Sequence, residues 1–322
     1  MTTDCTDSTD PCGQELLCQL QPGSAEQSHV HAATPSLKLS KRPAALSPSS
    51  LNTFQQCPLQ FRFIYVDKRP RKPALAAEKG TLVHAVLENL YDVLPAQRTP
   101  EKAESMVEPH WHATVKKCPE LPSQIFHTPH AEIDFINDAK TLCHQYFRLE
   151  NPQNLQPAHR EQYVHAQVAD GLRVHGFIDR VDIAPNGMVR LIDYKTGKAP
   201  APQYIGSGVF QLQFYAMMWK RSRDRLPARL QLLFLKDARN YTIDPIASDV
   251  ERTEDEVQAR WNDIKAGLDS GDFRPRQTPL CNWCDFQQIC PLFGGGGAAP
   301  AISEEGVTHM RSVETSTAGD SA

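Results

Sequence analysis

The amino-acid sequence predicts one α/β domain in which helices flank a mixed central sheet. The apolar pattern changes its period along the chain, and this change is the main evidence. Residues 79–94 carry apolar side chains at helical spacing, whereas residues 161–168 alternate and residues 176–198 hold two β-prone runs around a Pro-Asn-Gly turn. The chain has 322 residues and is 40% hydrophobic, so it can bury a sizeable core.

The first ordered element is expected just after a polar tail. Residues 1–44 are rich in Ser, Thr, Gln, Pro and Asp, which is typical of a disordered segment. Ser47 is a suitable N-cap, and Pro48 suits the first position of a helix. After the helix at 79–94, we expect a helical region that continues to about residue 150.

The second half of the chain supplies the remaining elements. After the hairpin come an apolar helix (209–221), a strand (229–237) and an amphipathic helix (253–269) that ends near Gly271. Residues 294–322 are rich in Gly, Ala, Ser and Thr, which predicts a second flexible tail. The predicted domain therefore spans residues 45–293.

Charge is unevenly distributed along the chain. The formal net charge is −4, yet residues 46–293 hold 30 basic and 29 acidic side chains. Net charge therefore neither supports nor excludes nucleic acid as a partner. No apolar stretch reaches the length of a membrane span, the first residues are acidic and polar, and no P-loop motif is present. We expect a cytoplasmic protein with no membrane partner, whose cysteines are mostly reduced or metal-bound.

The charged residues of the hairpin decide what it can do. Asp193 and Lys195 are two apart on a strand and therefore share a face. A two-residue Asn-Gly turn would place Asp179 opposite Tyr194, whereas a three-residue loop at 185–187 places it opposite Asp193. Pro at the start of the loop and Gly at its end favour the longer loop. The sequence thus predicts two carboxylates and a lysine on one face.

A pair of carboxylates in this position favours a bound cation. Two like charges about 4 Å apart, in an effective dielectric of about 20, repel by roughly 4 kcal/mol. A divalent ion offsets this repulsion, and carboxylate oxygens suit Mg²⁺ or Mn²⁺. The alternative is an ordinary ion pair between Asp179 and Arg180 or another base.

Four cysteines form a second candidate metal site. Cys281, Cys284 and Cys290 follow the pattern C-x₂-C-x₅-C, and Cys57 stands alone far upstream. Thiolates at this spacing are typical metal ligands, and a fourth from a distant segment completes a tetrahedral set. Spacing alone leaves zinc and a [4Fe–4S] cluster as alternatives. Either group would tie the first helix to the last ordered segment.

Several segments resemble the PD-(D/E)XK nuclease superfamily, and most closely its RecB-family exonuclease branch. The resemblance covers roughly residues 46–293 and implies a restriction-endonuclease-like core. It rests on the cysteine pattern and on four motifs: GTLVHAVLE (80–88), GFIDRVD (176–182), IDYKTGK (192–198) and QLQFY (211–215).

The resemblance implies a set of metal ligands. Asp179 and Asp193 would hold the divalent ion, with the backbone carbonyl of Tyr194 as a further ligand. His84 matches a histidine that this branch adds near the metal. Glu161 occupies a place where some members have another acidic ligand. Taken without the resemblance, His84 would be an ordinary hydrogen-bonded histidine on an amphipathic helix.

Three further residues are implied to support the reaction. Lys195 would orient the attacking water and stabilise its hydroxide form. Gln211 and Tyr215 lie one helical turn apart and match a Q-x-x-x-Y motif that supports the lysine and the DNA strand. Taken alone, this pair would be a polar seam on an apolar helix.

The resemblance implies hydrolysis of the phosphodiester bonds of DNA with Mg²⁺ or Mn²⁺. The implied enzyme is an exonuclease of DNA repair or recombination that acts on DNA ends or single strands. The cysteines resemble the iron–sulfur staple of AddAB-type and CRISPR-adaptation nucleases, which favours [4Fe–4S] over zinc. Residues 60–73 offer basic and aromatic side chains for phosphates and bases, and the alternative is a solvated loop after a helix. A helicase partner is compatible with this function. The alternatives are a CRISPR-adaptation-type nuclease with a partner and a catalytically silent DNA-binding or scaffold module.

Overall fold

The computed structural model describes residues 43–168 and 171–295. The predicted tails at 1–44 and 294–322 lie almost wholly outside the described residues. The main elements are α1 (Pro48–Gln56), α3 (Leu75–Leu90), α4 (Pro100–Lys117), α6 (Pro129–Tyr146), β1 (His159–Gln167), β2 (Arg173–Ile183), β3 (Val189–Lys195), α7 (Gly206–Arg223), β4 (Arg229–Phe234), β5 (Arg239–Ile243) and α8 (Ala247–Ser270). Shorter helical turns include α2 (Pro58–Phe61), η1 (Arg62–Val66), α5 (Leu121–Ile125), η6 (Pro279–Trp283), η7 (Gln287–Ile289) and η8 (Pro291–Phe293).

Five strands form one mixed sheet in the order β1-β2-β3-β4-β5. β3 and β4 pair parallel, and the other three neighbouring pairs are antiparallel. A parallel pair needs a crossover connection, which α7 provides. The predicted mixed α/β sheet is confirmed. β5 was not expected, because four of its five side chains are exposed and it has no buried alternation.

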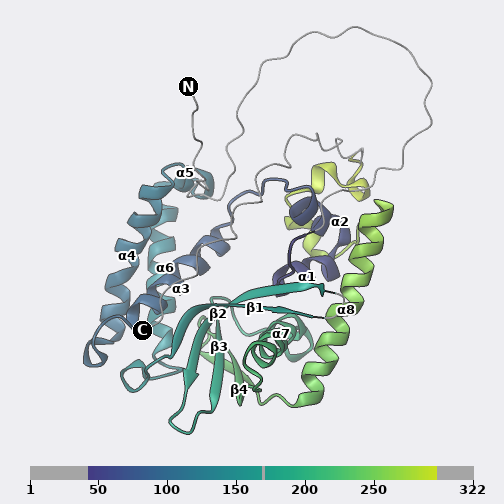
Figure 1. Cartoon of the computed structure of the whole chain (residues 1–322). Coiled ribbons are helices and arrows are strands. Elements are labelled where there is room, and N and C mark those ends of the chain that lie inside the picture. Colours follow the sequence, from purple (N-terminus) through teal and green to yellow (C-terminus); the bar gives the residue numbers. More distant parts are fainter. Residues whose placement is uncertain (1–42, 169–170, 296–322) are drawn as a thin grey trace, which may run out of the picture.

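Helices cover the two faces of the sheet and bury a separate core on each (Figure 1). α1, α7 and α8 pack over one face, and α3, α4 and α6 over the other. Neighbouring residues of β3 divide between them, since Leu191 belongs to the first core and Ile192 to the second. β3 is therefore buried on both sides, which explains its continuous apolar run. Within the described residues, none of the helices combines the length and apolarity needed to cross a bilayer.

Local capping fixes the ends of two helices. The Ser47 hydroxyl accepts the Ser50 amide at 3.2 Å, and the Ser50 hydroxyl accepts the Ser47 amide at 2.9 Å, with Pro48 at the first helical position. Gly271 ends α8 with a φ of +73°, a conformation that glycine adopts without steric cost. Both predicted boundaries are confirmed.

The β2–β3 hairpin closes with the three-residue loop. The Ala184 amide donates to the Met188 carbonyl at 2.9 Å, and the Gly187 amide donates to the Ala184 carbonyl at 2.7 Å. Gly187 has a φ of +78°, the left-handed residue that such a loop requires. The strands then pair in the predicted register, from Ile183 opposite Val189 onward.

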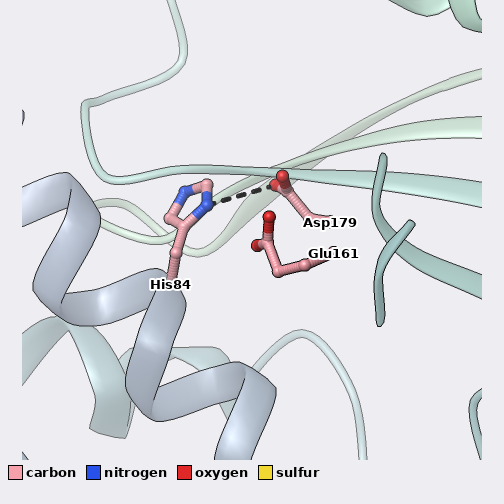
Figure 2. A group of neighbouring side chains, drawn as sticks. All are labelled: His84, Glu161 and Asp179. Atoms are coloured by element: carbon pink, nitrogen blue, oxygen red, sulfur yellow. Dashed lines mark ion pairs between the residues drawn. The ribbon is translucent and has the colours of Figure 1, made fainter. Parts of the chain in front are cut away.

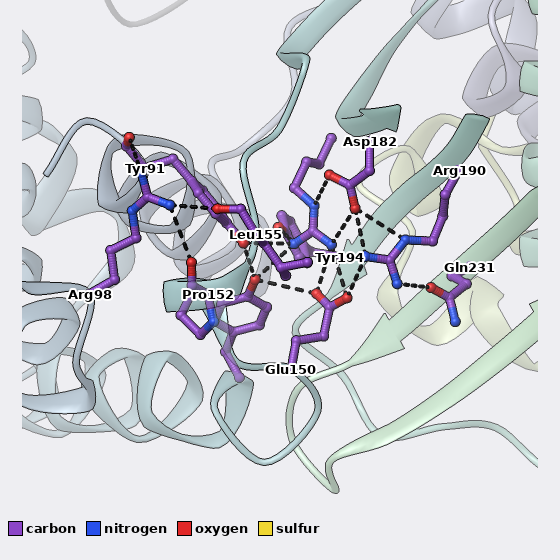
Figure 3. A network of polar contacts seen from close by, with 11 residues as sticks. Tyr91, Arg98, Glu150, Pro152, Leu155, Asp182, Arg190, Tyr194 and Gln231 are labelled. Atoms are coloured by element: carbon purple, nitrogen blue, oxygen red, sulfur yellow. Dashed lines mark hydrogen bonds and ion pairs between the residues drawn. The ribbon is translucent and has the colours of Figure 1, made fainter. Parts of the chain in front are cut away.

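A buried arginine ties the sheet to α3 and α6. Figure 3 shows several of its partners, among them Tyr91, Glu150, Asp182 and Tyr194. The Arg180 side chain is 0% exposed, and its guanidinium lies 2.7 Å from a Glu150 carboxylate oxygen and 3.1 Å from one of Asp182. It also donates to three tyrosine hydroxyls, those of Tyr91 (3.0 Å), Tyr146 (2.8 Å) and Tyr194 (2.9 Å). Because Arg180 pairs with these groups, the alternative ion pair between Asp179 and Arg180 is wrong.

Candidate metal and nuclease site

The site begins where β2 and β3 part. Their paired register ends at Arg180 opposite Ile192, so Asp179 and Asp193 are the next positions on the two strands. Beyond this point the Tyr194 amide donates to the Asp179 carboxylate at 2.6 Å instead of to a backbone carbonyl. Asp179 is 8% exposed and Asp193 2% exposed. The fork therefore places two buried carboxylates side by side, as the register predicts.

Three side chains from three elements point toward one another at this fork (Figure 2). One ligand atom from each of His84 on α3, Glu161 on β1 and Asp179 on β2 lies within 4.8 Å of the other two. His84 Nδ1 is 3.5 Å from Asp179 Oδ2, and His84 Nε2 is 3.1 Å from the Tyr194 carbonyl oxygen. The structure thus brings together three members of the ligand set that the resemblance implies, while Asp193 lies outside this group of three.

The backbone of Glu161 is strained at this place. Its φ is +43°, in the left-handed region that residues other than glycine seldom adopt. By the register of β1 with β2, it lies opposite Asp179. The alternation of β2 also breaks here, since Ile178 and Val181 are three apart yet pack into the same core. Strain of this kind is typical of functional sites, and no sequence pattern indicated it.

A chain of polar contacts links Asp193 to α7. Lys195 Nζ lies 2.6 Å from Asp193 Oδ2 and donates to Gln211 Oε1 at 2.7 Å. Gln211 Nε2 donates to Asp193 Oδ1 at 2.7 Å and to the Tyr215 hydroxyl at 2.8 Å. The sequence-predicted Asp193, Lys195, Gln211 and Tyr215 are therefore in direct contact.

Burial and mutual repulsion raise the pKa of the carboxyl groups. Burial, then the charge of Asp179, raises the pKa of Asp193 to about 6, against the opposing effect of Lys195. Burial, then the charge of Asp179, raises the pKa of Glu161 to about 7. Burial alone would lower the pKa of His84, but its contact with Asp179 and the nearby acids raise it to about 9. Without a cation, the site holds its negative charge at a cost in free energy.

The donor set fits a hard divalent cation. Ligand atoms of two carboxylates and one imidazole lie within 4.8 Å of one another, and the Tyr194 carbonyl contacts the same imidazole. Oxygen-rich sets of this kind suit Mg²⁺ or Mn²⁺. The raised pKa of Asp193 and Glu161 gives the same indication, because a cation at this point would favour their charged forms.

The four candidate cysteines lie where the end of α1 approaches the last described segment, although no three of their Sγ atoms lie mutually within 4.8 Å. The Arg276 amide donates to Cys57 Sγ at 3.5 Å, and Cys281 Sγ lies 3.9 Å from the Arg276 carbonyl oxygen. Burial raises the pKa of Cys284, and the charges of Cys57, Cys281 and Cys290 raise it further. The last segment is held there by Phe63 and Phe286, whose ring centroids are 5.2 Å apart. Segments more than 200 residues apart thus bring their thiols to one place.

Two of the three aromatic residues that the stretch 60–73 offered for bases are buried. Phe61 is 0% exposed and Phe63 5% exposed, and both belong to the core. Phe61 packs on Phe273, just beyond α8, and Phe63 on Phe286 of the last segment. The exposed residues of this stretch are Lys68, Pro70, Arg71 and Lys72.

Sequence comparison identifies the family to which this arrangement belongs. The profile of the PD-(D/E)XK nuclease superfamily matches residues 45–291. The chain belongs to this superfamily. The predictions of a nuclease and of a restriction-endonuclease-like α/β fold are confirmed, and divalent metal ions are the cofactors of this superfamily.

The relatives found are distant. The "Gene 69 protein" of Mycobacterium phage L5 is 24% identical over 285 residues, which cover 77% of this chain and 96% of the relative. That of phage D29 is 24% identical over 270 residues, with the same coverage. Two solved structures are similar at low identity. A protein of Eubacterium rectale called "Putative exonuclease" has 12% identity and a TM-score of 0.49, covering 75% of this chain and 87% of its own. SSO0001 has 16% identity and a TM-score of 0.37, covering 78% and 88%.

Proposed function

We propose that the protein is a Mg²⁺- or Mn²⁺-dependent deoxyribonuclease of the RecB-family type, an exonuclease that acts on DNA ends or single strands in repair or recombination. The observation that carries the proposal is the convergence of Asp179, Asp193 and Lys195 at the fork of β2 and β3. His84, Glu161 and the Tyr194 carbonyl complete the proposed ligand set.

Lys195 is the residue best placed to handle the attacking water. One of its three N–H donors is held by Gln211 Oε1 and its ammonium forms an ion pair with Asp193 Oδ2, so at least one donor is left for a water or a phosphate oxygen. Gln211 fixes the direction of the ammonium, because its amide is itself held between Asp193 and Tyr215. The cation, when bound, supplies Lewis acidity to the phosphate and lowers the pKa of a bound water.

The resemblance to the RecB branch is supported by two features beyond the superfamily fold. The first is the contact of Gln211 and Tyr215 with the acid and the lysine. The second is the set of four thiols that joins α1 to the C-terminal segment. An exonuclease needs a path for one strand toward the metal site, and the position of Lys195 at the mouth of the fork is compatible with this.

We also propose that the thiols hold a [4Fe–4S] cluster that has a structural role. Four thiolates at about 2.3 Å from a tetrahedral zinc stand only about 3.8 Å apart. Among the described cysteines no three Sγ atoms lie mutually within 4.8 Å, so the thiols stand farther apart than a single tetrahedral ion needs. Backbone amides of Arg276 and Thr278 donate to sulfur, as is common around such clusters.

Degradation of end-labelled DNA tests the nuclease. Anaerobically purified protein is incubated with single- and double-stranded substrates and Mg²⁺ or Mn²⁺, beside Asp193→Ala and Lys195→Ala. We expect the parent to release short products progressively from one end, and both variants to be inactive though folded. Internal cuts in closed circular DNA would contradict the exonuclease, and an inactive, folded, metal-loaded parent would favour the scaffold alternative.

Iron, sulfide and zinc analysis tests the cluster. We expect about four iron and four sulfide per chain and a broad visible absorption that dithionite bleaches. Cys284→Ser should lose both, whereas Cys143→Ser, a buried thiol outside the set, should keep them. One zinc per chain without sulfide would support the zinc alternative instead.

A further inference from the structure

The outer face of the β1–β2 pair carries aromatic side chains that none of the described helices covers. Strand alternation turns three residues of β1 and three of β2 outward, and they face each other in rows. The rows are Tyr163 with Phe177, His165 with His175, and Gln167 with Arg173. The inward neighbours Val164, Val174 and Ile178 belong to the core.

The Tyr163–Phe177 row is unusually open for aromatic residues. Tyr163 is 48% exposed and Phe177 52% exposed, with ring centroids 5.2 Å apart. The histidine row continues the surface, at 5.7 Å from Tyr163 to His165 and 6.1 Å from Tyr163 to His175. Tyr and Phe side chains mostly bury their rings, so a paired exposed set of this kind indicates a binding surface.

This aromatic face leads directly to the metal site. Tyr163 is two residues from Glu161 on β1, and Phe177 is two residues from Asp179 on β2. Two strand residues advance the chain by about 7 Å, so the open rings lie one row from the carboxylates at the fork. A strand of nucleic acid with its phosphate at the metal would therefore pass over these rings.

We propose that the outer face of β1 and β2 is a stacking platform for the unpaired bases of single-stranded DNA on its way to the metal site. The inference rests on the proposed nuclease function and deepens it by naming the substrate form. Unpaired bases expose their flat faces and stack on aromatic side chains without sequence preference. Bases in a duplex are already stacked on one another, so the platform selects single strands.

The charge of the face agrees with this occupant. None of the six side chains in the three rows is acidic, and Arg173 adds a positive charge at the end far from the carboxylates. A polyanion passing from Arg173 toward the cation would meet no repulsion from these rows. The rings that the sequence first offered for bases, Phe61 and Phe63, are buried and unable to do this.

Binding to a fluorescent oligothymidylate of about 20 nucleotides tests the platform. The full-length protein is titrated with Ca²⁺ in place of Mg²⁺ so that the probe is not cut. We expect Tyr163→Ala/Phe177→Ala to weaken binding at least tenfold, since each stacked base contributes roughly one factor of ten. The matched control is Tyr241→Ala, an exposed tyrosine on β5, which should bind as the parent does.

Conservative variants separate stacking from folding and from plain apolar contact. Tyr163→Phe and Phe177→Tyr keep the aromatic ring and should keep the affinity for the oligonucleotide. Phe177→Leu keeps only the apolar volume, and its affinity should fall nearly as far as that of Phe177→Ala. An oligonucleotide with 5-iodouracil should cross-link to Tyr163 or Phe177 under ultraviolet light. Affinity for a blunt duplex should change less than threefold.

The outcomes distinguish this inference from the proposed function. Hydrolysis of bis(p-nitrophenyl) phosphate with Mn²⁺ reports the metal site without bases, and the double variant should retain the parent rate. If the parent hydrolyses this diester but the double variant binds the oligonucleotide as tightly as the parent, the platform is wrong and the nuclease stands. A parent inactive on both diester and DNA refutes the function, while the Ca²⁺ titration still tests the platform. A variant that loses only self-association, with binding unchanged, would make the face a contact between copies and overturn the inference.

Discussion

At the residue scale, the site is defined by carboxyl groups whose charge is costly until a cation is present. Burial and the neighbouring Asp179 raise the pKa of Asp193 to about 6 and that of Glu161 to about 7. Lys195 offsets part of the charge of Asp193 but contacts neither oxygen of Glu161. Near neutral pH, the metal-free protein therefore retains protons that a bound divalent ion would displace.

Replacement of Glu161 by Gln should stabilise the metal-free protein at alkaline pH. The pKa of Glu161 is higher in the folded chain than in the unfolded chain, so its ionisation destabilises the fold. The effect begins above the unfolded pKa and is complete above the folded pKa of about 7. Thermal melting in EDTA should give a higher Tm for Glu161→Gln than for the parent at pH 8, with the difference shrinking toward pH 4.5. A difference that grows as the pH falls would contradict this assignment. Mn²⁺ should raise the Tm of the parent more than that of the variant.

Replacement of Lys195 by Met should separate catalysis from metal binding. The lysine donates one free N–H to the reacting groups but supplies no metal ligand, so loss of this donor should lower kcat by about 10²- to 10³-fold. Mn²⁺ affinity, measured by electron paramagnetic resonance, should stay within a few fold of the parent. Asp193→Asn is the contrasting variant, and it should lose both activity and tight Mn²⁺ binding. Equal loss of Mn²⁺ binding in the two variants would count against a separate role for Lys195.

At the element scale, a glycine in β2 lets α7 pack closely against this strand. A Cβ on Gly176 would lie 2.9 Å from Tyr215 Cε1 and 3.2 Å from Met218 Cε. Tyr215 holds Gln211, which in turn holds Asp193 and Lys195. The close approach of the strand to the helix therefore fixes the position of the whole polar chain.

Gly176→Ala should reduce activity by moving Tyr215. The added methyl group forces the ring aside, and we expect a fall in kcat of about tenfold, since misplacement of supporting groups by an ångström is costly. The measurement is kcat with Mn²⁺ on single-stranded DNA, with circular dichroism to confirm the fold. Gly197→Ala, where a Cβ would meet nothing within 4 Å, is the control and should behave as the parent.

The hairpin and its register were predictable because the information is local. A Pro-Asn-Gly loop selects one closure, and closure decides which side chains share a face. The strain at Glu161 and the role of Arg180 were not predictable in this way, because they depend on contacts with segments distant in sequence, such as Glu150, which leave no periodic signal. The strand β5 was not predictable because four of its five side chains are exposed and show no alternation.

At the scale of the whole molecule, two polar or thiol clusters join segments that are far apart. The Arg180 cluster binds β2 to α3 and to the end of α6, close to the metal fork. Tyr194 belongs to the Arg180 cluster and to the metal fork. Its hydroxyl accepts a hydrogen bond from Arg180, and its carbonyl oxygen lies 3.1 Å from His84 Nε2. The Arg276 amide donates to Cys57 Sγ and so links the end of α1 to the C-terminal segment. The metal fork itself is held by the Arg180 cluster, through contacts that only the folded chain forms.

Arg180→Met should destabilise the protein strongly. Removing one member of a buried charge cluster leaves its partners uncompensated, and we expect the free energy of unfolding to fall by about 3 kcal/mol. This is the lower end of the usual range, because Arg190 still pairs with Glu150 and Asp182. Urea unfolding measures the change. Arg229→Met removes an exposed pair with Asp244 and should leave the midpoint nearly unchanged. Comparable shifts in the two variants would show that the buried cluster contributes no more than a surface pair.

The central claim is that a divalent cation binds at the fork of β2 and β3, and anomalous X-ray scattering from crystals soaked in Mn²⁺ tests it most directly. We predict a manganese peak within coordination distance of Asp179, Asp193 and the Tyr194 carbonyl, which disappears in Asp193→Asn crystals. A protein that cleaves DNA with Mn²⁺ but shows its manganese elsewhere would contradict the account.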